Sequence, residues 1–93
     1  MSKQRFASVW DAIEDIPEEA ENMKLRCTLM TALRAHLAQT KMSQTQAARI
    51  FDVTQPRISD LMRGKINLFS LDALVNMATA AGLEVKLQVI EAA

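Results

Sequence analysis

The sequence has few residues that break or cross-link a chain: one cysteine, two glycines and two prolines among 93 residues. With Cys27 as the only cysteine, no disulfide can form within the chain. The scarcity of glycine and proline favours long regular helices. No apolar run is long enough to span a membrane, and the N-terminus lacks the apolar segment of a signal peptide, so we expect a cytoplasmic protein.

Residues that commonly carry out chemistry are equally scarce. His36 is the only histidine, and about two and a half turns of one predicted helix separate it from Cys27, so the two cannot form a catalytic dyad. The sequence contains no glycine-rich phosphate loop and no cluster with the ligand spacing of a metal site. We therefore expect no catalytic residue, no metal and no cofactor. The hydrophobic content of 49% predicts one folded domain.

The charges are unevenly distributed although the net charge is zero. Residues 1–23 carry two basic and six acidic side chains, a net charge of −4. Residues 24–65 carry eight basic and two acidic side chains, a net charge of +6. The zero total argues against a nucleic-acid-binding protein, but the basic central region suits a partner with a negative surface. An ordinary solvated helix surface is the alternative explanation of this charge.

The most informative segment covers residues 43–64 and predicts two short helices joined by a tight turn. Ser43 and Gln46 have the spacing of a capping box at the start of the first helix. Thr54 can cap the second helix, Pro56 fits its first turn, and Gly64 ends it. The solvent side of the second helix carries side chains suited to base edges and phosphates, namely Gln55, Arg57, Ser59, Asp60 and Arg63.

Two further helices are expected to complete the core. Leucine recurs at every fourth position within residues 24–41, which predicts a helix with a core-facing stripe. An upstream helix that begins at Pro17 either continues into this helix or ends near Asn22. Ser70 can cap a last helix, which Gly82 ends.

The two ends of the chain differ from this predicted core. Residues 1–23 form an acidic arm in which Trp10 and Ile13 supply the apolar side of a short helix. Trp10 either docks on the core of its own domain or contacts a partner. We place the helical domain at residues 24–82.

The tail, residues 83–93, alternates apolar and polar side chains, with Val85, Leu87 and Val89 on one face, which is typical of a strand. A lone strand leaves its backbone groups unpaired, and the chain offers no second strand. We therefore expect a homodimer in which two tails pair, with irregular packing on its own domain as the alternative.

Residues 43–64 resemble, without gaps, the helix-turn-helix of the Cro-type (XRE) regulators, the class that includes the phage lambda repressor. The shared features are the Ser-Gln start of the first helix, the Gln at the start of the second, and the final Gly. Asp52 departs from the pattern, because many members have glycine in this turn, but aspartate tolerates positive φ better than most residues. Residues 24–26 and 67–74 resemble a narrower, HigA-like subgroup that contains many antitoxins of toxin–antitoxin pairs. The resemblance implies an all-α, lambda-repressor-like bundle, to which the tail adds a C-terminal strand.

The resemblance also implies roles for individual side chains. It places the helix of residues 54–63 in the major groove of double-stranded DNA. In a dimer, two such helices would meet the half-sites of a palindromic operator about 34 Å apart. Four side chains are expected to read bases: Gln55, Pro56, Arg57 and Asp60. Five are expected to contact phosphates: Gln44, Thr45, Ser59, Arg63 and Lys65.

The sequence therefore predicts a sequence-specific DNA-binding transcriptional regulator, and in particular the autorepressing antitoxin of a toxin–antitoxin pair. Toxins of the resembled subgroup are typically basic ribonucleases, which the acidic arm complements in charge. A stand-alone or phage-type repressor without a toxin is the first alternative. The second is a protein-interaction module that has lost DNA binding, and the polar, basic face of the second helix argues against it.

Overall fold

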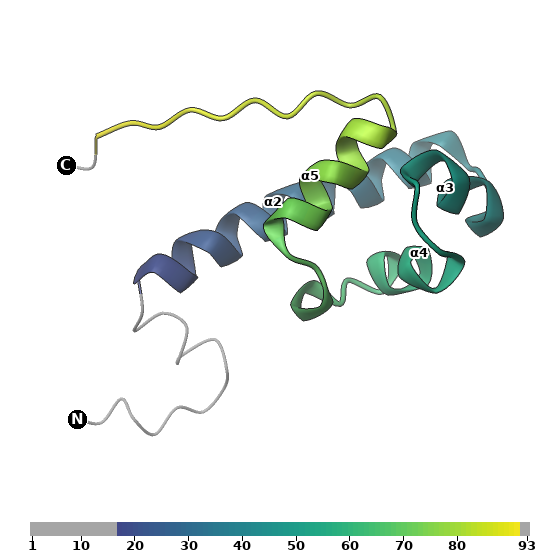
Figure 1. Ribbon diagram of the computed structural model, residues 1–93, viewed down its shortest axis with the longest axis horizontal. Helices are drawn as coiled ribbons and strands as arrows, with labels where there is room; N and C mark the ends of the chain where they lie inside the picture. Colours follow the sequence, from purple (N-terminus) through teal and green to yellow (C-terminus); the bar gives the residue numbers. More distant parts are fainter. Residues whose placement is uncertain (1–16, 92–93) are drawn as a thin grey trace, which may run out of the picture.

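The computed structural model describes residues 17–91, which form four α-helices and one 3-10 turn (Figure 1). The elements are α2 (Pro17–Thr40), α3 (Gln44–Phe51), α4 (Gln55–Met62), η2 (Ile66–Leu68) and α5 (Leu71–Ala80). Helices α4 and α5 pack against the long helix α2, and α3 packs against α4 and α5. The described chain is thus all-helical, as the sequence predicts for a helix-turn-helix bundle.

Helix α2 runs unbroken through Asn22, so the predicted upstream helix and the leucine-striped helix are one element. Pro17 begins it, and Glu18 and Glu19 lie in its first turn, where carboxylates interact favourably with the positive end of the helix dipole. The stripe meets the core along the C-terminal part of the helix, where three side chains are buried: Met30, Leu33 and Leu37.

The predicted acidic arm lies mostly outside the described residues. Trp10, Ile13 and the short helix that would carry them fall within residues 1–16. Residues 17–23 form the first turns of α2, so the boundary drawn between residues 23 and 24 falls inside a helix. The domain boundaries stay predictions.

The short helices begin at the capping residues that the sequence predicts. The Ser43 hydroxyl accepts a hydrogen bond from the Gln46 backbone N–H at 3.1 Å, and the Gln46 side-chain oxygen accepts from the Ser43 N–H at 3.0 Å. Thr54 accepts from the Arg57 N–H at 3.4 Å, and Ser70 caps α5 in the same manner. These bonds satisfy N–H groups that the first turn of a helix leaves without a partner.

Each of the four described helices is followed by a residue with positive φ: Lys41 (56°), Asp52 (59°), Gly64 (73°) and Gly82 (81°). Gly64 and Gly82 therefore end their helices as predicted. In the turn between α3 and α4, the Val53 N–H bonds to the Ala48 carbonyl oxygen at 2.9 Å and closes the helix end. Asp52 holds a backbone conformation in this turn that glycine adopts without steric cost.

We expect Asp52→Gly to raise the free energy of unfolding by up to about 1 kcal/mol, because glycine removes the cost of the left-handed backbone. Gly82→Ala is the matched control: a Cβ there meets no atom within 4 Å, so only the backbone cost of about 1 kcal/mol is added. Urea denaturation followed by circular dichroism measures both. A lower stability of Asp52→Gly would contradict the expectation that the left-handed backbone of Asp52 is costly.

The core fills the space between α2 and the three short helices. Its largest fully buried side chains come from every α-helix and from the loop after η2: Leu33, Phe51, Ile58, Leu61, Phe69 and Leu74. No polar or charged side chain is buried among the described residues. The hydrophobic effect therefore holds the helices together, and the polar groups available for recognition lie at the surface.

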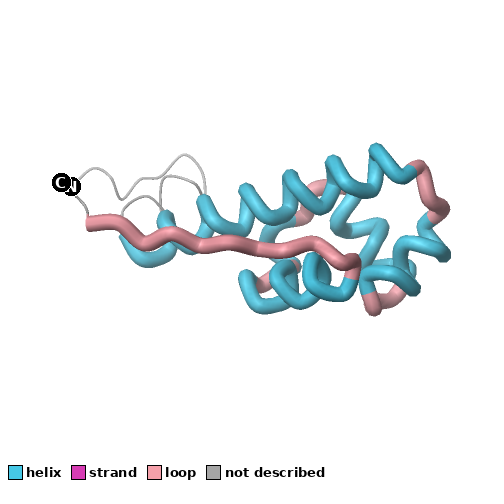
Figure 2. Tube along the Cα trace, turned by 90° about the horizontal axis from the view of Figure 1, so that it is seen from above, coloured by secondary structure: helices cyan, strands magenta, loops and turns pink. Residues whose placement is uncertain are grey.

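The predicted C-terminal strand is not present in the described chain. The Leu83 N–H bonds to the Ala78 carbonyl oxygen at 2.9 Å and closes α5, and the tail then extends along α2 toward its N-terminal end (Figures 1 and 2). It is extended without strand pairing because no other described segment lies beside it as a second strand. A second copy would have to supply that strand, so the dimer pairing of Val85, Leu87 and Val89 stays a prediction.

Candidate nucleic-acid interface

The N-terminal ends of α3 and α4 meet on one face of the molecule. Gln44 of α3 and Gln55, Pro56 and Ser59 of α4 line one shallow hollow there. Gln44, Gln55 and Pro56 are exposed, and Ser59 is half-buried. Because the N-terminus of a helix carries a partial positive charge and free N–H groups, this face suits a negatively charged ligand.

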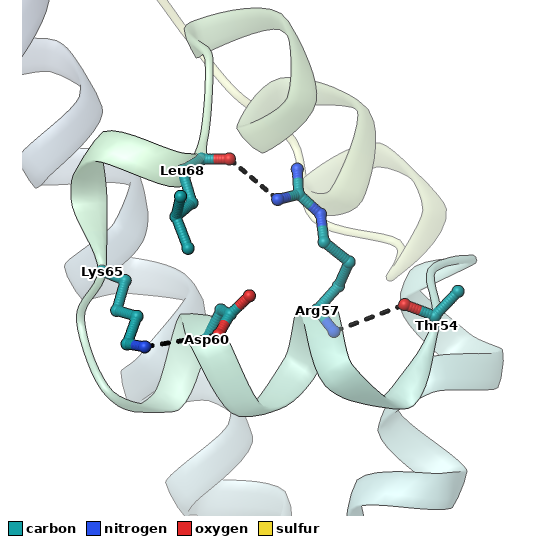
Figure 3. Close-up of polar contacts among 5 residues, drawn as sticks. All are labelled: Thr54, Arg57, Asp60, Lys65 and Leu68. Carbon is teal, nitrogen blue, oxygen red and sulfur yellow. Dashed lines mark hydrogen bonds and ion pairs between the residues drawn. The ribbon is translucent and has the colours of Figure 1, made fainter.

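The other two expected base readers lie on a different side of α4, toward η2 (Figure 3). Arg57 donates from Nη1 to the Leu68 carbonyl oxygen at 2.8 Å. Asp60 forms a long ion pair with Lys65, with Oδ1 and Nζ 4.0 Å apart. The structure thus divides the four expected readers into two pairs: Gln55 and Pro56 beside α3, and Arg57 and Asp60 beside η2.

The expected phosphate contacts surround the hollow and the end of α4. Thr45 is exposed in the first turn of α3, next to Gln44, and Arg63 and Lys65 are exposed where α4 ends. Sequence reasoning missed Arg34 of α2, whose Nη1 would lie 3.3 Å from a Cβ atom at Gly64. The Arg34 guanidinium thus lies beside Gly64 and brings another cation to the end of α4. No local pattern predicts this, because the two residues are thirty positions apart in the sequence.

The rest of the described surface offers little else for chemistry. No group of three His, Cys, Asp or Glu side chains in residues 17–91 lies close enough to hold a metal ion. His36 is half-buried on α2, with its ring centroid 6.3 Å from that of Phe51. None of the described helices is both long and apolar enough to cross a membrane.

Comparison with known proteins agrees with this geometry. A family model described as a helix-turn-helix domain matches residues 12–90. The chain belongs to this helix-turn-helix domain family. The match includes part of the predicted acidic arm and most of the tail.

A solved structure described as a candidate XRE family transcriptional regulator is similar to this helix-turn-helix chain, with a TM-score of 0.72 and 27% sequence identity. The match covers 80% of this chain and 83% of that one. No curated protein matches the sequence. The XRE-type helix-turn-helix is thus supported by sequence and by structure, whereas the HigA-like subgroup stays a prediction.

Proposed function

We propose that the protein is a sequence-specific DNA-binding transcriptional regulator that places α4 in the major groove. The observation that carries this proposal is the exposed face at the N-terminal ends of α3 and α4, where Gln44, Gln55 and Ser59 gather around one hollow. A glutamine side chain can bond to N6 and N7 of adenine together, and helix N-termini favour phosphates. Membership of a helix-turn-helix family supports a binding protein over an enzyme.

The geometry favours different roles for the expected contact residues. Gln55 is the best-placed base reader, and Pro56 beside it can make apolar contact with a thymine methyl group. Gln44 at the start of α3 suits a phosphate contact, as do the side chains around it and at the end of α4: Thr45, Ser59, Arg63 and Lys65. Arg57 and Asp60 would have to leave their present partners before they could contact a base.

Footprinting on the DNA upstream of the protein's own gene tests this function. Two protected half-sites with two-fold symmetry, centred about 34 Å apart along the helix axis, are expected of a dimeric helix-turn-helix protein. A uniform, sequence-independent protection at every concentration would contradict a specific regulator.

We further propose that the regulator is a homodimer whose tails pair as antiparallel strands. The tail leaves Val85, Leu87 and Val89 exposed to 39%, 72% and 86%, and its backbone groups beyond residue 83 have no ladder partner among the described residues. An exposed, apolar, unpaired strand is a template for pairing with another chain.

Leu87→Glu is expected to raise the dissociation constant of the dimer by at least about a hundredfold, because a charge replaces an apolar contact in both copies. Gln88→Glu is the matched control, since it adds the same charge on the polar face of the tail. Sedimentation equilibrium measures both variants. Equal dimerisation of the two would show that this face of the tail is not the interface.

The finer proposal is that the regulator is the autorepressing antitoxin of a toxin–antitoxin pair. Its support is the acidic N-terminal region, which carries a net charge of −4 together with Trp10 and Ile13 and would complement a basic ribonuclease toxin. A stand-alone repressor without a toxin is the alternative. A module that has lost DNA binding is disfavoured by the polar exposed side chains of α4.

Deletion of residues 1–16 is expected to abolish binding to the product of a neighbouring small basic reading frame and to leave DNA binding unchanged. The deletion stops before Pro17 because α2 begins there and packs on the core. Isothermal titration calorimetry with the full chain, the deletion and Trp10→Ala measures the effect. Unchanged affinity for that protein after the deletion would remove residues 1–16, with Trp10 and Ile13, as its binding site.

A further inference from the structure

We infer that Arg57 is a positioning residue that sets the orientation of α4 and does not itself contact DNA. This inference rests on the DNA-binding function proposed above. Nη1 of Arg57 donates to the Leu68 carbonyl oxygen at 2.8 Å, and the guanidinium carbon lies 4.2 Å from the centroid of the Phe69 ring. The side chain therefore leaves the first turn of α4 and reaches the segment that follows this helix (Figure 3).

The partners of Arg57 make a rigid support. Phe69 is 1% exposed and belongs to the core, so its ring cannot move without disturbing the packing around it. Leu68 is the last residue of η2, and its carbonyl oxygen holds the guanidinium from one side while the ring holds it from another. A planar guanidinium can donate from its edge while its face stacks on the ring, whereas a lysine ammonium has no planar face to stack.

A second arginine fastens the same segment to α2. Nη1 of Arg26 lies 3.4 Å from the carbonyl oxygens of both Ile66 and Phe69. Polar contacts thus lead from α2 through Arg26 to the η2 segment, and from there through Arg57 to the first turn of α4. Since α4 is only eight residues long, one fixed side chain near its start has a large influence on the direction of the helix.

The position of Arg57 on α4 agrees with this role. It follows Gln55 by two residues, which places the two side chains about 200° apart around the helix axis. When Gln55 and the hollow it shares with Gln44 face the groove, Arg57 faces away from it. To reach DNA, Arg57 would have to give up its hydrogen bond and its contact with the Phe69 ring together.

The test compares Arg57→Gln with Arg63→Gln. Arg57→Gln removes one positive charge from the first turn of α4, and Arg63→Gln removes one from its C-terminal end, where Arg63 is exposed. Binding to the DNA upstream of the gene and to scrambled DNA is measured over a salt series, at a temperature where circular dichroism shows every variant folded. We expect Arg57→Gln to weaken binding to the upstream DNA roughly three- to thirtyfold, the range that one hydrogen bond and one cation–π contact allow. Its affinity for scrambled DNA and its salt slope are expected to stay unchanged. Arg63→Gln is expected to weaken binding to both DNAs and to lower the salt slope by about one.

Arg57→Lys keeps the positive charge but removes the planar guanidinium. We expect it to weaken binding to the upstream DNA as Arg57→Gln does. A salt slope lowered by about one in Arg57→Gln would show a phosphate contact and overturn the inference. Loss of preference at a single base pair would show direct reading and overturn it as well. Unchanged affinity for the upstream DNA, with only a lower melting temperature, would make the contact merely structural and also overturn it.

Failure of the proposed function can be distinguished from failure of the positioning role, because it is seen in the wild-type protein before any substitution is made. Wild-type protein that binds the upstream and scrambled DNA equally, with and without the neighbouring gene product, contradicts a sequence-specific regulator, and the positioning role falls with it. Selective binding by the wild type with no loss in Arg57→Gln overturns the positioning role alone.

Discussion

Gln55→Ala is expected to weaken binding to the DNA upstream of the gene by about 1–3 kcal/mol and to leave binding to scrambled DNA nearly unchanged. The side chain is exposed in the first turn of α4, beside Gln44 and at the N-terminal ends of two helices. Its amide can make two hydrogen bonds to one adenine, and both are lost on truncation. Fluorescence anisotropy with each DNA measures the difference.

Gln39→Ala provides the control for this prediction, since Gln39 is also an exposed helical glutamine but lines the groove between α2 and the tail. We expect it to bind both DNAs as the wild type does. An equal loss on both DNAs in Gln55→Ala would remove Gln55 as a residue that reads sequence.

Leu61→Ala is expected to lower the free energy of unfolding by about 2–5 kcal/mol. Leu61 is 0% exposed and belongs, with Ile58, to the buried side of α4, so its truncation leaves a cavity between the recognition helix and the core. A domain of this size has only about 5–15 kcal/mol of stability, so the variant loses a large share of it. DNA binding is expected to fall with the folded fraction.

Met62→Ala is the matched control for Leu61→Ala, because Met62 is the next residue on α4 and is 38% exposed. We expect it to cost less than about 1 kcal/mol, since its side chain gains little from burial. Urea denaturation followed by circular dichroism compares the two. Similar losses in both variants would contradict the placement of Leu61 in the core.

The helix boundaries around the site could be predicted from the sequence because capping is a local property. Ser43 with Gln46, Thr54 and Ser70 each bond to a backbone N–H three residues ahead, so sequence spacing contains the whole interaction. The positive φ of Asp52 could also be predicted from the sequence, because it follows from the tight turn between two adjacent helices. Lys41 gave no such signal, since lysine is not a residue that usually marks a left-handed helix end.

The contacts that decide which side chains face DNA could not be predicted in the same manner. Arg57 lies in a helix whose period places it at the surface, but its partner Leu68 is eleven residues away, and their meeting depends on how η2 folds back. The tail presents the opposite difficulty. Its alternating apolar and polar residues are the full local signal of a strand. A strand forms only beside a second strand, however, and the described residues contain none.

The central claim is that this helix-turn-helix protein reads a DNA sequence, and one binding experiment tests it most directly. Fluorescence anisotropy compares the DNA upstream of the gene with scrambled DNA of equal length over a salt series, with and without the neighbouring gene product. We predict binding at least about a thousandfold tighter to the upstream DNA, with an affinity that falls steeply as salt rises. Equal, weak binding to both DNAs under both conditions would contradict the claim.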